Sequence, residues 1–241
     1  MNTFSLHLQE FQHRCLYLAI CFFFTFLICC LEFQSLLHHL ASPLKGTHLV
    51  ITDLPEFWYA TFHLAFHITI ICIFPYLLYS LSCFIIPALH QNEFGLLIST
   101  ASMLLFLFLL SLGLSCFFFL PFFVNILFFS SPDPKFVEID CLPKLLPYVS
   151  FISNLIISNF FVFQVLGILI IFLKQNKIPI KSLITSRKIV YILILLLSAF
   201  ISPPEVISQI LLSFILFSVY EFSVFYCIWV QTGLKGKTIP A

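Results

Sequence analysis

The feature that most constrains this chain is a series of long stretches without a charged side chain. Residues 15–31, 57–91, 94–131, 145–173 and 189–204 contain no Asp, Glu, Lys or Arg, and the stretch 206–234 contains only Glu221. A helix needs about 20 apolar residues to cross a bilayer. Only 9% of the 241 residues are charged, whereas soluble proteins carry about 25%. We therefore predict an all-α integral membrane protein.

The apolar stretches predict the number of membrane spans. We expect six transmembrane helices, at about 15–33, 62–86, 96–120, 149–173, 189–202 and 207–229. The fifth and sixth helices are expected to be short; the fifth, at roughly 14 residues, would cross only a locally thinned bilayer. All six would belong to a single membrane domain over residues 1–241.

Positively charged residues predict how these helices are oriented. Six spans place both termini on one side, and that side would hold eight of the eleven basic residues; Lys45, Lys135 and Lys144 would lie opposite. Basic residues favour the cytoplasmic side of a membrane. We therefore expect both termini in the cytoplasm, or in the equivalent matrix or stroma. Two proline-containing loops, 34–55 and 130–147, would cap the other side.

Three polar side chains inside the predicted spans are candidates for contacts within the membrane. Glu221 is the only formal charge well within one, where a carboxylate costs several kcal/mol unless it is protonated, paired or in a wet cavity. Its position suits either a contact with a partner or a hydrogen bond within the bundle. Gln164 and Gln209 are amides on the fourth and sixth spans, and such residues are typical of helix packing.

His63 and His67 are four residues apart, which places both rings on one helical face, as in a metal site. No third histidine or acid with a fitting spacing joins them, so the sequence favours packing near the membrane interface. The nine cysteines include no CxxC pair, which favours free thiols over zinc ligands. We predict no metal, cofactor or catalytic residue, because the chain has no HExxH, GxSxG or P-loop motif. A net charge of +1 gives no indication of nucleic-acid binding.

Several short motifs occur in a characteristic order. They are HLQEFQHR at 7–14, SPL at 42–44, TD at 52–53, PALHQNE at 87–93, SPPEVISQ at 202–209 and YE at 220–221. Together they resemble the HLxELRxR, APL, TD, PALYxxE, TPPDxxSQ and FE or YE motifs of the TatC family, most closely its mitochondrially encoded members. The chain departs from the family pattern at Gln12, Phe94 and Gln164, where an arginine, a basic residue and a glutamate are usual.

The resemblance implies a function. TatC proteins are the core receptor of the twin-arginine, Sec-independent translocase, which binds signal peptides of folded cargo and uses the proton motive force. The residues implied to bind the signal peptide are Glu10, Arg14 and Glu93. The residues implied to contact single-helix TatA/TatB-type subunits within the membrane are Gln164, Glu205, Gln209 and Glu221. A homo-oligomer in the mitochondrial inner membrane is expected, with a plastid thylakoid or bacterial inner membrane as the alternative.

Two other classes of function stay open at this point. A small-solute or ion transporter would need a polar path through the bundle. A non-transporting assembly factor for a respiratory complex would tolerate substitution of Glu10 and Glu93.

Overall fold

The computed structural model describes most of the chain as helix. It covers residues 3–44, 49–89, 91–129, 143–174 and 180–201, and short stretches at 209–210, 213–214, 216–218, 220–222, 224–225 and 228–229. The elements are α1 (Thr3–Leu31), α2 (Phe33–Ala41), η1 (Ser42–Leu44), α3 (Glu56–Ile85), η2 (Ile86–Ala88), α4 (Gln91–Leu114), η3 (Ser115–Phe119), α5 (Leu120–Phe129), α6 (Leu145–Lys174) and α7 (Ile180–Ile201). Within these ranges there is no strand, which agrees with the predicted all-α class.

The helices form two compact units. The N-terminal unit comprises Met1–Ile157, the C-terminal unit comprises Ser158–Ala241, and the boundary falls inside α6. A bilayer favours helices because every backbone N–H and C=O must be paired within the segment that crosses it.

Four helical segments are long and apolar enough to cross a membrane. They are His7–Leu31, Glu56–Ile85, Phe94–Asn125 and Leu145–Val165. These segments overlap the first four predicted spans. The six-span count and the side of the termini stay predictions, because the sixth span is described only in short stretches. Most of the predicted second cap, 130–142, also lies outside the described residues.

The fifth predicted helix is longer than its apolar stretch indicated. α7 has 22 residues, Ile180–Ile201, which corrects the predicted helix at 189–202. The helix includes three charged residues that precede the apolar stretch, Lys181, Arg187 and Lys188. Lys and Arg are good helix formers, so helical geometry extends beyond the apolar part. α1 likewise begins at Thr3, well before its first apolar run.

A π-helical turn interrupts the third candidate span. η3 follows α4 and leads directly into α5, where Pro121 is the second residue. A proline ring clashes with the carbonyl four residues earlier, here that of Phe117, and removes one helical hydrogen bond. The wider π turn includes that residue and accommodates the clash without ending the helix.

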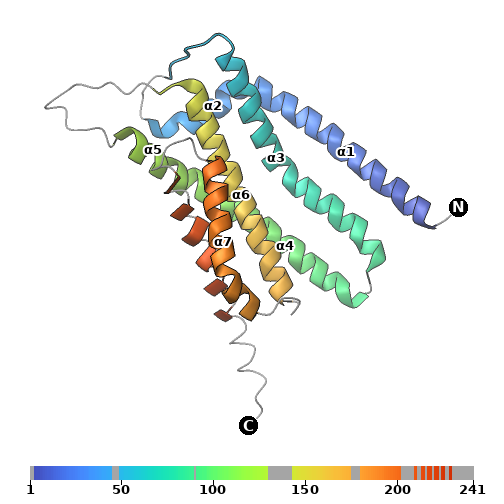
Figure 1. Cartoon of the computed structure of the whole chain (residues 1–241). Coiled ribbons are helices and arrows are strands. Elements are labelled where there is room, and N and C mark those ends of the chain that lie inside the picture. The colour runs from blue at the N-terminus through green and yellow to red at the C-terminus, as the bar shows by residue number, and fades with distance from the viewer. Residues whose placement is uncertain are drawn as a thin grey trace. The chain divides into compact units, whose positions relative to one another are not determined.

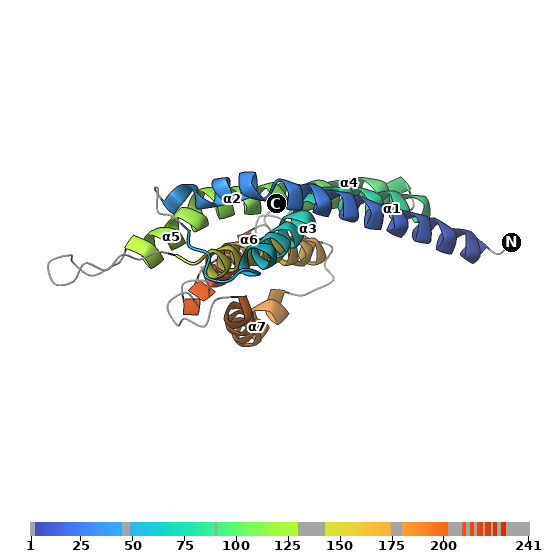
Figure 2. The ribbon, with the colours of Figure 1, turned by 90° about the horizontal axis from the view of Figure 1, so that it is seen from above.

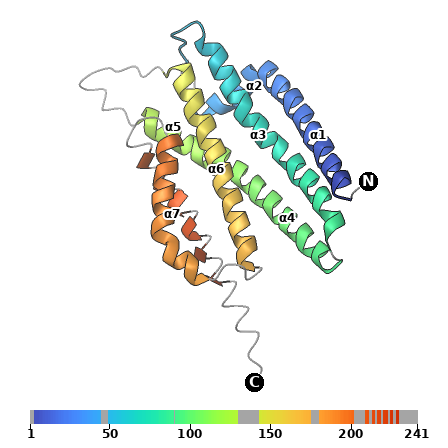
Figure 3. The same cartoon turned by 45° about the vertical axis from the view of Figure 1, so that its right-hand side comes forward.

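In the N-terminal unit, α1 and α3 lie side by side along much of their lengths (Figures 1 and 3). Phe22 of α1 meets Phe66 of α3 edge to face, with ring centroids 6.0 Å apart, and Phe26 stacks on Phe62 at 6.3 Å. Within the unit, α1 leaves its other apolar side chains largely exposed. An evenly apolar helix with little protein contact is typical of a lipid-facing span.

The core of the N-terminal unit lies where α2, η1, α5 and the start of α6 meet. Phe33, Leu44, Phe123 and Val149 are all almost fully buried. Viewed from above, α2 lies beyond the end of α1, on the side of α5 (Figure 2). The Tyr148 hydroxyl of α6 donates to the carbonyl of Leu40 in α2 at 2.8 Å. The described first part of the predicted cap, residues 34–44, is therefore helical and anchored to α6.

The Glu56 carboxylate joins the start of α3 to the start of α6. Its Oε2 accepts from the backbone N–H of Thr52 at 2.7 Å, from the Thr52 hydroxyl at 3.1 Å and from the backbone N–H of Asp53 at 3.3 Å. Its Oε1 accepts from the backbone N–H of Leu146 at 2.9 Å. First-turn N–H groups of a helix have no partner within that helix. Glu56 therefore provides a capping acceptor for α6 as well as for the loop before α3.

Two backbone hydrogen bonds reinforce this junction. The N–H of Val50 donates to the carbonyl of Pro143, and the N–H of Leu145 donates to the carbonyl of Val50, both at 3.0 Å. They form an isolated parallel bridge between Val50 and Lys144. We call this bridge and the Glu56 bonds together the Glu56 clamp.

Replacing Glu56 tests the clamp. Glu56→Ala removes the acceptor of four hydrogen bonds, and we expect a loss of about 2–4 kcal/mol of unfolding free energy, since bonds to charged groups contribute about 1.5–3 kcal/mol. Glu56→Gln should also destabilise, because an amide presents only one acceptor oxygen. Denaturation of the detergent-solubilised protein, followed by circular dichroism, measures the change. Glu32→Gln, at an exposed acid without a side-chain cap bond, is the matched control. Equal stabilities for both variants would contradict the role of Glu56.

Candidate functional site

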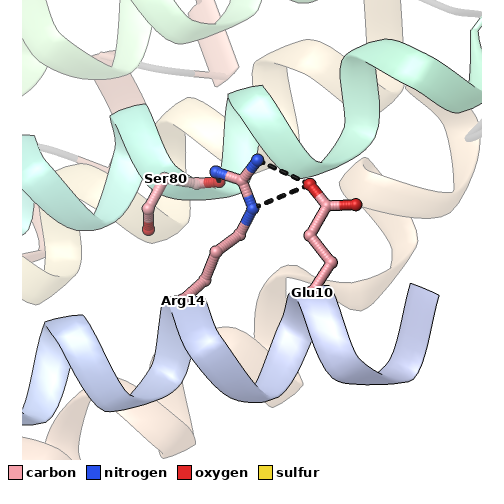
Figure 4. Close-up of polar contacts among 3 residues, drawn as sticks. All are labelled: Glu10, Arg14 and Ser80. Carbon is pink, nitrogen blue, oxygen red and sulfur yellow. Dashed lines mark hydrogen bonds and ion pairs between the residues drawn. The ribbon is translucent and has the colours of Figure 1, made fainter. Parts of the chain in front are cut away.

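Glu10 and Arg14 form an ion pair on α1 (Figure 4). Nη2 of Arg14 lies 2.7 Å and Nε 3.2 Å from Oε1 of Glu10. Nη1 reaches the backbone carbonyl of Ser80 in α3 at 3.5 Å. The two side chains keep 29% and 37% of their surface exposed. Arg14 therefore bridges α1 to α3 and holds one oxygen of Glu10, while the other oxygen points away from the guanidinium.

A hollow of about 510 Å³ surrounds this pair. We call it the tyrosine hollow; it is lined by Glu10, His13, Arg14, Tyr17, Tyr76, Tyr79 and Ser80. The rings of Tyr17 and Tyr79 are more than half exposed. Aromatic faces attract cations, and a planar guanidinium both stacks on them and binds carboxylates. The lining is therefore suited to a cationic side chain, above all an arginine.

Glu93 lies in the first turn of α4, which follows η2 after α3. The junction of α3 and α4 lies at the same end of the N-terminal unit as the N-terminus of α1 (Figures 1 and 3). The Glu93 side chain is outside the described residues. A carboxylate in the first turn of a helix is stabilised by the helix dipole. The structure thus brings Glu10 and Arg14 together and places the backbone of Glu93 at their end of the unit.

In the C-terminal unit, Glu221 has partners on α7. Its Oε1 accepts a short hydrogen bond from the hydroxyl of Tyr191, and its Oε2 lies 3.5 Å from Nη2 of Arg187. Tyr191 also packs edge to face against Phe217, with ring centroids 5.2 Å apart. The in-chain hydrogen bond predicted as one possibility is therefore present. About 41% of the Glu221 side chain stays exposed, which leaves room for a further contact.

The other three predicted polar residues occupy different environments. Gln164 on α6 is buried, and both atoms of its amide lack a hydrogen-bond partner in the described part of the chain. Burying an amide in this way is costly. Gln209 is half-buried, and Glu205 lies outside the described residues.

Sequence reasoning missed the side chains that complete these clusters. Tyr76 and Tyr79 are three residues apart on α3, a spacing that places both on one helical face. This spacing could have predicted from the sequence that the two rings lie side by side. Arg187 was counted only for orientation, although it lies one turn before Tyr191 on a helical face. No local pattern linked either residue to Glu221.

Comparison with known proteins agrees with these observations. The family described as "Sec-independent protein translocase protein (TatC)" matches residues 6–214. A TatC-like protein of Nephroselmis olivacea, ymf16, is 30% identical over 97% of this chain and 98% of its own length. The Sec-independent protein translocase protein TatC of Escherichia coli K12 is 26% identical over 91% of this chain and 86% of its own.

The fold of this chain resembles that of solved structures. A crystal structure of the twin-arginine translocase receptor TatC superposes with a TM-score of 0.78 at 23% identity, covering 93% of this chain and 99% of that one. A second crystal structure, in the detergent DDM, gives 0.76 at 24% identity over 91% and 98%. Fold and family match define a membrane subunit of a Sec-independent protein translocase, and not an enzyme. The chain belongs to the TatC family.

A double-mutant cycle tests the pair in the C-terminal unit. Arg187→Gln and Glu221→Gln each break one side of the contact, and the double variant removes both. We expect a coupling energy of roughly 0.6–1.7 kcal/mol, the scale of polar contacts between membrane helices. Unfolding of the four proteins in a denaturing detergent measures it. Strictly additive losses would show that the two side chains do not interact.

Proposed function

We propose that this chain is the receptor that binds twin-arginine signal peptides for a Sec-independent translocase. The tyrosine hollow is the observation that carries the proposal: it combines a carboxylate with exposed tyrosine rings at one end of α1 and α3. An arginine of the signal peptide would place its guanidinium against Glu10 and stack on Tyr17 or Tyr79.

The charges assign different roles to the three predicted residues. Glu10 and Arg14 neutralise each other, so the pair alone has little attraction for a cation. Arg14 positions Glu10 and leaves one carboxylate oxygen for the signal. Glu93 supplies a second carboxylate, and each acid takes one of the two arginines through charge-assisted hydrogen bonds.

The departures from the family pattern lower the charge of this surface. Gln12 replaces a usual arginine and the exposed Phe94 replaces a usual basic residue. Both replacements remove a positive charge that would repel a guanidinium, and the tyrosines add stacking contacts to it. The proposed recognition in this chain therefore combines carboxylates with aromatic rings at a surface that has lost cationic side chains.

The C-terminal unit is the proposed contact for single-helix TatA/TatB-type subunits. Glu221 is half-exposed, and neighbouring apolar rings such as Phe214 and Phe222 are strongly exposed. Gln164, Gln209 and Glu205 would add polar contacts within the membrane. The chain would act as an oligomer with these partners, driven by the proton motive force.

We further propose the mitochondrial inner membrane as its location. The 33 phenylalanines in a chain with 6 glycines support this choice as an organellar composition, and the similarity to ymf16 agrees with it. A plastid thylakoid or bacterial inner membrane is the alternative.

Photo-cross-linking tests the signal site. A photoreactive residue in place of Tyr76, which lines the hollow, should cross-link to a twin-arginine peptide. It should not cross-link to the same peptide with both arginines replaced by lysines. Glu10→Gln and Glu93→Gln should each reduce capture about tenfold, the scale expected when a contact to a charged group is lost. Glu32→Gln, at an acid outside the hollow, should leave capture unchanged. Full capture by both acid variants would refute the assignment of the site.

A second cross-linking experiment tests the partner contact. With the photoreactive residue in place of the exposed Phe222, Glu221→Ala should lower capture of the single-helix subunits several-fold, because a buried polar contact is lost. Arg187→Gln, which breaks the ion pair but keeps the carboxylate, separates direct contact from altered packing. If Glu221→Ala captures partners as the unchanged chain does, Glu221 is not a contact.

A further inference from the structure

His63 and His67 of α3 are placed as a pair. Their ring centroids lie 4.4 Å apart, with the ring planes inclined by 41°. Side chains four residues apart on a helix are neighbours on one face. The sequence alone favoured packing for these residues, and the structure adds the hydrogen bonds that orient each ring.

The hydrogen bond of His67 fixes the position of its proton. Its Nδ1 lies 2.7 Å from the backbone carbonyl of His63. A carbonyl oxygen only accepts, so the proton of the neutral ring is on Nδ1. The lone pair is therefore on Nε2, on the opposite side of the ring from the helix backbone contact.

The same reasoning applies to His63. Its Nδ1 lies 3.0 Å from Oγ of Ser153 on α6, and the Ser153 hydroxyl donates to the carbonyl of Ser150 at 3.2 Å. When the hydroxyl proton goes to Ser150, Oγ accepts from Nδ1–H of His63. In this arrangement both rings donate through Nδ1 and keep a lone pair on Nε2. Imidazoles that bind metals show this pattern, with the second nitrogen donating to an oxygen that fixes the ring.

Both rings line an open groove of about 550 Å³. Its other lining residues are Phe26, Tyr59, Phe62, Phe66 and Leu146, and no carboxylate is among them. Hard cations such as Mg²⁺ and Ca²⁺ need oxygen ligands, whereas imidazole suits zinc, copper and nickel. Two histidines at positions i and i+4 of one helix have the spacing at which the HExxH motif binds a single Zn²⁺.

We propose that His63 and His67 form a two-imidazole site for a transition-metal ion of the zinc class. No third His, Cys, Asp or Glu joins them in the described part of the chain. Water or an anion entering through the open groove would complete the coordination. Ser153 acts as a positioning residue, because it holds the His63 ring in the metal-binding tautomer. The proposal does not depend on signal-peptide binding at the other end of α3.

Zinc titration of the full chain in detergent tests the site. The cysteine thiols are first alkylated, because the nine of them would bind zinc as well. Competition with a chromophoric zinc chelator should then show one Zn²⁺ per chain. His67→Gln and His63→Gln should each lower the affinity at least tenfold. The double variant His38→Gln and His39→Gln removes two adjacent histidines of α2 and should leave binding unchanged.

Two further measurements separate a metal site from a structural role. Ser153→Ala should weaken zinc binding about tenfold, the lower end of the effect of losing such an orienting bond. X-ray absorption of the zinc-loaded, unsubstituted chain should show two imidazole nitrogens at about 2.0–2.1 Å. Zinc binding that persists in His67→Gln, or a zinc ion without imidazole ligands, would overturn the proposal.

Discussion

The N-terminal unit depends on one carboxylate that serves two helices. The bonds from Thr52 and Leu146 place Glu56 between the start of α3 and the start of α6. Helix starts expose N–H groups that need acceptors, and these two helices begin at adjacent points of the unit. This one side chain, the first residue of α3, accepts from the loop before α3 and from the first turn of α6, so hydrogen-bond geometry sets the relative position of the two helix starts. The aromatic contacts of α1 with α3 and the bond from Tyr148 of α6 to Leu40 of α2 attach the remaining helices to this pair.

Two other pairs of charged side chains are also stabilised by partners within the chain. Glu10 with Arg14, and Arg187 with Glu221, are opposite charges paired within the chain and half-exposed. Pairing lowers the cost of a charge near hydrocarbon, and the exposed half of each pair stays available to a partner. A neutral pair attracts a cationic peptide weakly, however. A second acid at the same end of the unit, the proposed role of Glu93, would add the attraction for a cationic peptide that the neutral pair lacks.

The charge-free stretches predicted the first four spans and the helical class because a bilayer imposes length and polarity on every crossing segment. They did not predict where every helix begins, since α7 starts at Ile180 and includes Arg187 and Lys188 ahead of the apolar stretch. The pairing of Glu10 with Arg14 was accessible from their spacing of four residues. The Glu56 clamp was not, because Leu146 is 90 residues away and no local pattern reports such a contact. The partners of Glu221 required the same long-range information.

α3 connects all the features proposed for the N-terminal unit. Its buried positions include small or short side chains, among them Ala60, Ala65 and Thr69, which permit close approach of neighbouring helices. The same helix carries the polar groups: Glu56 at its start, the two histidines about two turns later, and Tyr76, Tyr79 and Ser80 near its end. Because small residues fix the helix against its neighbours, its polar side chains are presented from a rigid support. The tyrosine hollow and the histidine groove lie toward opposite ends of the same helix, so substitutions in one leave the other's residues untouched.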